Sequence, residues 1–112
     1  MNDNIDDREL LELAAKAAGI KHPGGDHCVN GPAIWDIERL KWWRPLTDDG
    51  DALRLTILLG INIEIEIRQV GFTCASAIDY SSAVLIECHD NSPAAATRRA
   101  IVRAAAEIGR QM

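Results

Sequence analysis

Residues 61–70 alternate large apolar and polar side chains over a longer stretch than any other part of the chain. The apolar positions are Ile61, Ile63, Ile65 and Ile67, and the polar positions between them are Asn62, Glu64, Glu66 and Arg68. A period of two is that of a β-strand, whose side chains point alternately to opposite faces. The pattern therefore predicts a strand with a buried isoleucine face and a wet polar face, as in an antiparallel sheet that is covered on one side.

Three other segments carry the apolar spacing of amphipathic helices, namely 6–18, 48–59 and 93–110. Each begins with a side chain that can accept a hydrogen bond from the first backbone amides of a helix. We expect Asp6 or Asp7, Thr47 and Ser92 in these capping positions. A glycine follows each of the first two segments, where a left-handed residue often ends a helix.

Two further strands are expected at 72–78 and 83–89, and a loop rich in glycine and proline at 21–33. Residues 34–44 mix strand and turn features, with Trp35, Ile37 and Leu40 as candidates for burial. This order of elements predicts a single α+β domain over residues 1–112. We expect a small antiparallel sheet of about three strands, packed with helices in an α-β-α layered sandwich.

The chain has 112 residues, a net charge of −5 and three cysteines. Nucleic-acid binders usually present a basic face to the phosphates, so the acidity of this chain argues against that class. The acidic N-terminus has no apolar signal-peptide core, and no apolar run is long enough to span a bilayer. We therefore expect a cytoplasmic protein with reduced thiols and no membrane partner.

Two motifs in this chain occur in a characteristic order. A Trp-x-Pro-Leu-Thr motif at Trp43–Thr47 leads into an acidic helix start, and Ser92-Pro93 followed by alanines opens the last helix. Over roughly residues 35–110 the chain resembles the phage ABA sandwich domain family, a group of small NinX-like bacteriophage and prophage proteins. The resemblance implies an α-β-α layered sandwich and a phage or prophage origin. It implies no known activity, because the family has no assigned catalytic residues.

Trp42 and Trp43 lie between Lys41 and Arg44. Tryptophans beside cations suit base stacking, cation–π contacts or a protein interface. In a small domain, however, tryptophan more often fills the core. We expect one of the two to be buried where sheet and helix meet, and we take Trp42, Trp43 and Arg44 as candidate partner-binding residues.

Charged residues on a strand and on a helix complete the candidate partner-binding set. Glu64, Glu66 and Arg68 share the polar strand face and would become interface residues if a partner covered it. The last helix carries a basic stripe that can meet an acidic partner or a phosphate and otherwise faces water. The stripe consists of Arg99, Arg103 and Arg110.

The sequence contains no recognisable catalytic or metal-binding constellation. His22, His27 and Cys28 share the 21–33 loop, but their spacing matches no standard zinc pattern. Cys88 precedes His89, but neighbouring strand residues point to opposite faces, so they form no thiol–base pair. We therefore expect no catalytic residue, no metal and no cofactor.

These observations favour a non-enzymatic accessory protein that binds a host or phage protein, or a second copy of itself as a homodimer. Two alternatives stay open. One is a small-ligand-binding protein or cryptic enzyme that uses the 21–33 loop with Trp42 or Trp43. The other is nucleic-acid binding through Lys41–Arg44.

Overall fold

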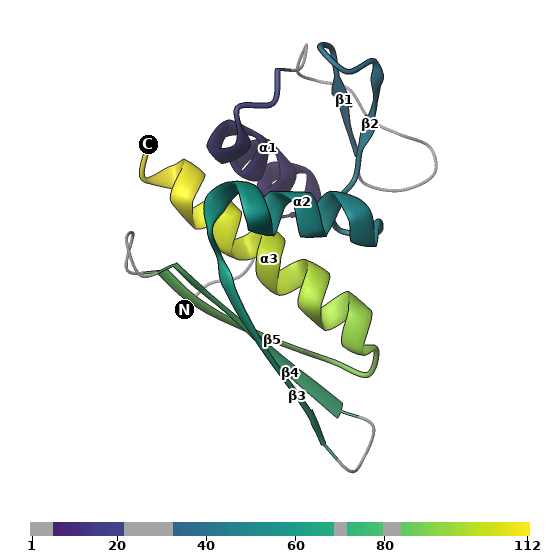
Figure 1. Ribbon diagram of the computed structural model, residues 1–112, viewed down its shortest axis with the longest axis vertical. Helices are drawn as coiled ribbons and strands as arrows, with labels where there is room; N and C mark the ends of the chain where they lie inside the picture. The colour runs from purple at the N-terminus through teal and green to yellow at the C-terminus, as the bar shows by residue number, and fades with distance from the viewer. Residues whose placement is uncertain (1–5, 22–32, 69–71, 80–83) are drawn as a thin grey trace.

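The computed structural model describes residues 6–21, 33–68, 72–79 and 84–112, and it has an α+β fold (Figure 1). In chain order the elements are α1 (Asp7–Ala18), β1 (Ile34–Asp36), β2 (Lys41–Trp43), α2 (Asp49–Leu59), β3 (Asn62–Arg68), β4 (Phe72–Asp79), β5 (Val84–Asp90) and α3 (Pro93–Arg110). The predicted α+β class is confirmed. The mixed stretch at 34–44 forms the hairpin β1–β2, and residues 22–32 of the predicted loop lie outside the described residues.

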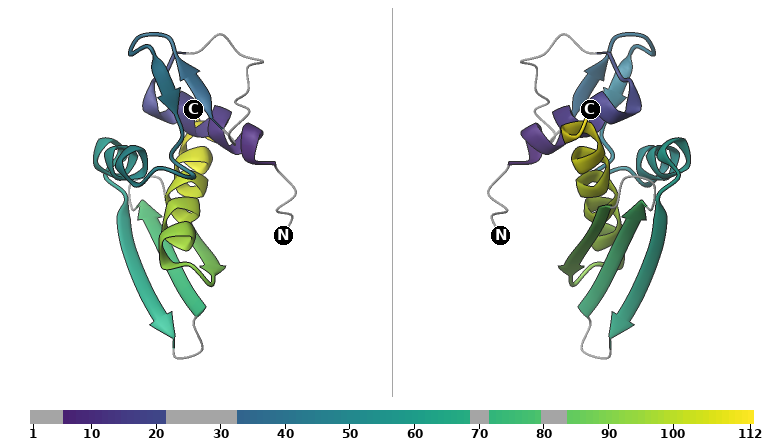
Figure 2. Two further views of the ribbon diagram at one scale, coloured as in Figure 1. Left: turned by 90° about the vertical axis from the view of Figure 1, so that its right-hand side faces the viewer. Right: turned by 90° about the vertical axis from the view of Figure 1, so that its left-hand side faces the viewer.

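β3, β4 and β5 form an antiparallel sheet in which β4 is central and the other two strands are the edges. α3 lies along one face of this sheet, and α1 and α2 pack mainly against α3 (Figures 1 and 2). The helices of the described chain thus gather on one side of the sheet. The opposite face, which carries Glu64 and Glu66, has no helical cover within the described residues.

The helix ends follow the expected chemistry with one correction. Asp6 caps α1 by accepting a hydrogen bond from the Glu9 amide at 2.9 Å. For α2, however, the cap is Asp48 instead of Thr47, and its Oδ2 accepts from the Asp51 amide at 2.8 Å. Residues 44–48 form a turn in which the amides of both Thr47 and Asp48 donate to the Arg44 carbonyl, so the helix begins one residue later than predicted.

α3 is buried on two sides, and its alanines contribute to both. Toward the sheet, Ala96, Ala100 and Ala104 share a cluster with Ala75 and Ala77 of β4. The side toward the other helices contributes a second cluster with α1 and α2, which includes Ile101, Val102, Ala105, Leu10, Leu11 and Leu55. Because alanine side chains are short, α3 can approach both layers closely.

The β1–β2 hairpin places one tryptophan in the core and two at its surface. Trp43 is buried beside its cross-strand partner Ile34. Trp35 and Trp42 are half-buried and meet edge to face, with ring centroids 5.3 Å apart. Ile37 and Leu40, which the sequence indicated as candidates for burial, are exposed because they lie in the turn that projects beyond this cluster.

Candidate functional site

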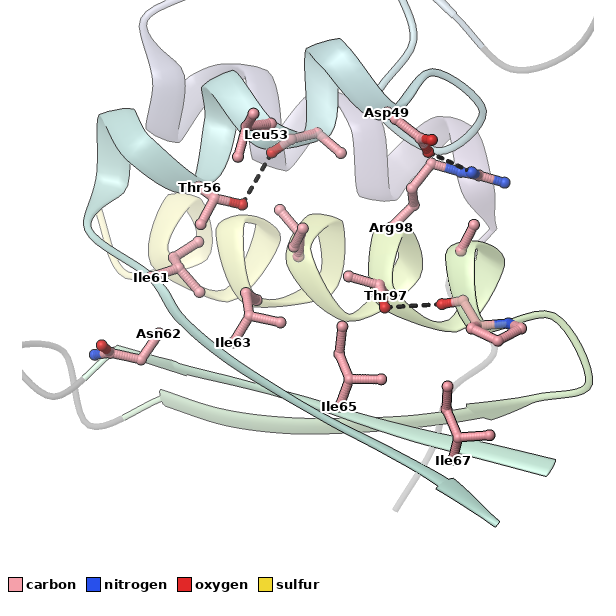
Figure 3. Close-up of a pocket in the computed structure, with 14 residues that line it drawn as sticks. Asp49, Leu53, Thr56, Ile61, Asn62, Ile63, Ile65, Ile67, Thr97 and Arg98 are labelled. Carbon is pink, nitrogen blue, oxygen red and sulfur yellow. Dashed lines mark hydrogen bonds and ion pairs between the residues drawn. The ribbon is translucent and has the colours of Figure 1, made fainter. Parts of the chain in front are cut away.

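The isoleucine face of the β3 segment is covered along only part of its length. Its four isoleucines share one face and point toward the helices, as predicted (Figure 3). Ile61 is 6% exposed, whereas Ile65 and Ile67 are 50% and 65% exposed. The prediction that all four are buried is therefore wrong for the second half of the strand, because α3 packs mainly over β4 and β5.

These half-exposed isoleucines form the floor of a groove of about 620 Å³, which we call the isoleucine groove (Figure 3). α2 and the first half of α3 provide its other walls. Its apolar lining consists of Ala52, Leu53, Ile61, Ile63, Ile65, Ile67, Pro93, Ala94 and Ile101. Leu53, on the α2 wall, is 59% exposed. A contiguous apolar surface of this kind often marks a binding site for a protein or an apolar ligand.

Most of the polar lining groups of the isoleucine groove already have partners within the chain. The hydroxyls of Thr56 and Thr97 donate to the carbonyl oxygens of Ala52 and Pro93 at 2.9 and 2.8 Å. At one end of the groove, Arg98 donates to Asp49 at 2.6 Å (Figure 3). The same guanidinium also donates to the Leu46 carbonyl at 2.8 Å. The groove therefore offers a ligand mainly apolar contact.

The groove borders an exposed edge of the sheet. β3 is an edge strand, and its groove side carries the isoleucines while its other side carries Glu64 and Glu66, both exposed. Arg68, the third residue predicted on that side, ends β3, and its side chain lies outside the described part of the structure. The acidic pair and the groove thus lie on opposite faces of one strand.

The predicted Lys41–Arg44 cluster is largely engaged inside the fold. Trp43 is in the core, as expected of one of the two tryptophans, and Trp42 is half-buried. The Lys41 ammonium lies 3.7 Å from a carboxylate oxygen of Asp51, and the Arg44 amide donates to the other oxygen at 3.0 Å. Neither tryptophan lines the isoleucine groove.

Asp51 is a buried carboxylate that joins β2 to α2. Burial by itself raises the pKa of Asp51. Hydrogen bonds from the Arg44 amide and the Arg54 guanidinium lower it, as do the charges of Lys41 and Arg54. These interactions outweigh burial and hold the pKa below the ordinary value of 3.8. The Arg54 bond is 2.8 Å long. Because these interactions pair the carboxylate so fully, we assign it a structural role.

The basic stripe predicted on the last helix does not form a continuous solvent-facing surface. Arg99 makes two hydrogen bonds to the Asp7 carboxylate, at 3.0 and 3.2 Å, and so joins α3 to the start of α1. Arg103 lies 3.6 Å from the sulfur of Cys88 on β5. Arg110 pairs with Glu107 on the same helix at 3.0 Å. Arg99 and Arg103 therefore connect elements of the fold.

The last features to place are the possible metal ligands and any membrane-spanning helix. Among the described residues, no cluster of histidine, cysteine and acidic side chains is arranged to hold a metal ion. His22, His27 and Cys28 lie outside the described residues. Cys88 is buried, as expected of a strand cysteine on the helix-facing side. No helix in the described part of the chain is long and apolar enough to cross a bilayer.

Sequence reasoning missed the groove because it assigned every isoleucine to the core. One signal of an exposed apolar surface was present in the sequence of α2, because its large apolar residues point in more directions than one buried face requires. Ala52 and Leu55 of α2 are buried, whereas three further apolar residues of this helix are exposed: Leu53, Ile57 and Leu58. Such an excess indicates a helix with apolar surface beyond its core contacts.

The fold and the groove define a small α+β protein with an apolar groove beside an edge strand. Comparisons of the chain with models of protein families, with curated proteins and with solved structures found no match.

Proposed function

We propose that the protein acts by binding another protein, whose apolar side chains fill the isoleucine groove. The observation that carries this proposal is the exposure of Ile65 and Ile67 on a concave surface whose polar groups are mostly paired already. Burial of apolar surface contributes roughly 25 cal/mol per Å² before the costs of association. An apolar partner surface gains this contribution here, whereas a polar ligand finds few groups to bind.

The groove also supports binding in preference to catalysis. Its charged lining residues, Asp49 and Arg98, form an ion pair with each other, so their charges are already matched within the chain. A catalytic group must instead be poised to exchange protons or to attack a substrate. We therefore propose that the protein is not an enzyme.

The resemblance of residues 35–110 to the phage ABA sandwich family supports a phage or prophage origin. On that basis the proposed protein is an accessory factor that works in the cytoplasm of a bacterial host. Its partner is then a host or phage protein.

Capture of partners by the purified protein tests the proposal. The wild type is immobilised and exposed to lysate from bacteria with and without phage, and retained proteins are identified by mass spectrometry. Ile67→Lys places a charge in the groove. Leu85→Lys is the matched control, because Leu85 is 64% exposed, also lies on an edge strand, and faces away from the groove.

We expect a partner that the wild type and Leu85→Lys retain and that Ile67→Lys loses. Retention of the same proteins by all three forms would exclude the groove as the binding surface. Both substituted side chains are largely exposed, so we expect each variant to keep its fold. Circular dichroism and urea unfolding of each variant test this.

A further inference from the structure

We propose that the partner contributes an extended segment that adds to the outer edge of β3 as a fourth strand and alternates apolar with basic residues. This inference rests on the proposed function and specifies the chemistry of the partner. Three features of β3 carry it: its edge position, its apolar groove face and its acidic opposite face.

The edge position supplies backbone groups for pairing. In an antiparallel ladder, every second residue of an edge strand directs its N–H and C=O away from the neighbouring strand. Among the described backbone–backbone hydrogen bonds, none joins residues 62–68 to an element other than β4. Over the seven residues of β3, the edge is about 23 Å long at about 3.3 Å per residue. A segment of similar length can therefore pair along it.

The groove face specifies apolar side chains at alternate positions of the added strand. Such a strand lies about 4.8 Å from β3, and its side chains alternate between the same two faces. Those on the groove side lie next to Ile65 and Ile67, which line the groove together with Leu53 of α2. Branched apolar residues such as valine or isoleucine match these neighbours best.

The opposite face specifies basic side chains at the positions between. Glu64 and Glu66 are exposed there, and the register places Glu64 in one row with Ser76 of β4 and Glu87 of β5. Lysine or arginine of the added strand would lie directly across from or diagonal to the two β3 glutamates, where opposite charges stabilise pairing. The net charge of −5 adds a long-range attraction for a basic segment.

A second copy of this chain fits the edge less well than a basic segment. Two β3 strands that pair about a two-fold axis overlap most fully in registers centred on Glu64, Ile65 or Glu66. Each of these registers places a glutamate of one copy directly opposite a glutamate of the other. Like charges in directly opposed positions are destabilising.

Synthetic peptides of seven residues, the length of β3, test the inference by fluorescence anisotropy. The main probe alternates valine and lysine, and a block peptide of the same composition keeps the charge without the alternation. A third peptide alternates valine and glutamate. We expect the valine–lysine peptide to bind about tenfold or more tightly than either of the others, which is a difference of about 1.4 kcal/mol.

Two N-methylated forms of the valine–lysine peptide test strand addition itself. One carries methyl groups on the valine amides and the other on the lysine amides. In an added strand only one of these sets faces β3, so one form should lose binding and the other should keep it. Equal binding by both forms, or equal loss, would overturn strand addition.

Protein variants locate the binding edge. Ile67→Lys and Glu64→Gln should each weaken the valine–lysine peptide severalfold, and Leu85→Lys should leave its affinity unchanged. Loss of affinity in Leu85→Lys equal to that in Ile67→Lys would overturn the assignment to β3. Static light scattering that shows a wild-type dimer, dissociated by Ile67→Lys, would instead assign the edge to a second copy.

The two levels of the proposal fail separately. Capture of a lysate protein that depends on Ile67, without preference for the alternating peptide, would overturn the inference and leave the binding function in place. Absence of both results would remove the binding function as well.

Discussion

The uncovered half of the isoleucine face predicts a steep gradient in the cost of truncating it. Ile61→Ala removes a side chain that is 6% exposed, and Ile67→Ala removes one that is 65% exposed. Buried Ile→Ala substitutions cost about 2–5 kcal/mol, because they lose transfer free energy and leave a cavity. We therefore expect the free energy of unfolding to fall by about 3 kcal/mol in Ile61→Ala.

The expected cost at Ile67 is much smaller. Roughly a third of its surface is buried, which corresponds to about 0.5–1 kcal/mol of the 1.5–3 kcal/mol for a fully buried isoleucine. Lower β-propensity of alanine adds a few tenths of a kcal/mol, within a scale that spans about 1 kcal/mol. The two variants should therefore differ by about 2 kcal/mol.

Urea unfolding followed by circular dichroism measures this difference. With a slope of about 1–2 kcal/mol per molar urea, the two midpoints should lie roughly 1–2 M apart. Leu85→Ala, at a similarly exposed position on the opposite sheet face, serves as the control for Ile67→Ala. Equal costs at Ile61 and Ile67 at low protein concentration would refute the groove, because Ile67 would then have to be covered by the chain itself.

Three further predictions follow from the same packing. Gly109→Ala should lower the free energy of unfolding by about 1–3 kcal/mol, measured by thermal unfolding, because the alanine Cβ would overlap the Leu13 carbonyl and push α1 away from α3. Unchanged stability would mean that the two helices pack more loosely. Asp51→Asn should cost about 1–3 kcal/mol at pH 7. The lowered pKa of Asp51 means that its carboxylate stabilises the fold above pH 3.8 and loses this effect as the pH falls through the folded-state pKa. The unfolding free energies of the variant and the wild type in urea should therefore converge at acid pH. A difference that stays constant with pH would contradict this. Leu40→Gly should not destabilise the hairpin and should raise the unfolding midpoint slightly, because Leu40 is exposed at a φ of 56°; a clear loss of stability would show that the leucine side chain has a packing role.

Much of the fold could be predicted because the governing signals are local. The period of two at 61–70, the serine–proline start at 92–93 and the glycine after each of the first two helices determine strands and helix ends from adjacent residues. The shared face of the four isoleucines was also predictable, since it depends only on strand geometry.

The extent of cover over that face was not predictable, because it depends on where α3 crosses the sheet. The crossing is determined by the alanines of α3 and β4, which permit α3 to approach the sheet closely over β4 and β5. The periodic pattern of β3 contains no information about this crossing. In the same way, Arg99 was expected in solvent because its partner Asp7 lies far away in sequence, at the start of another helix. Contacts between distant segments thus account for both errors.

The position of α3 between two separate clusters has a consequence for synthesis of the chain. Residues 93–110 leave the ribosome after every other helix and strand described, yet both clusters need them as a common wall. A nascent chain that ends before Pro93 therefore exposes alanines and isoleucines on the sheet and leucines on α1 at the same time. Stable folding should begin only when this helix emerges, and until then the exposed apolar surface is open to aggregation.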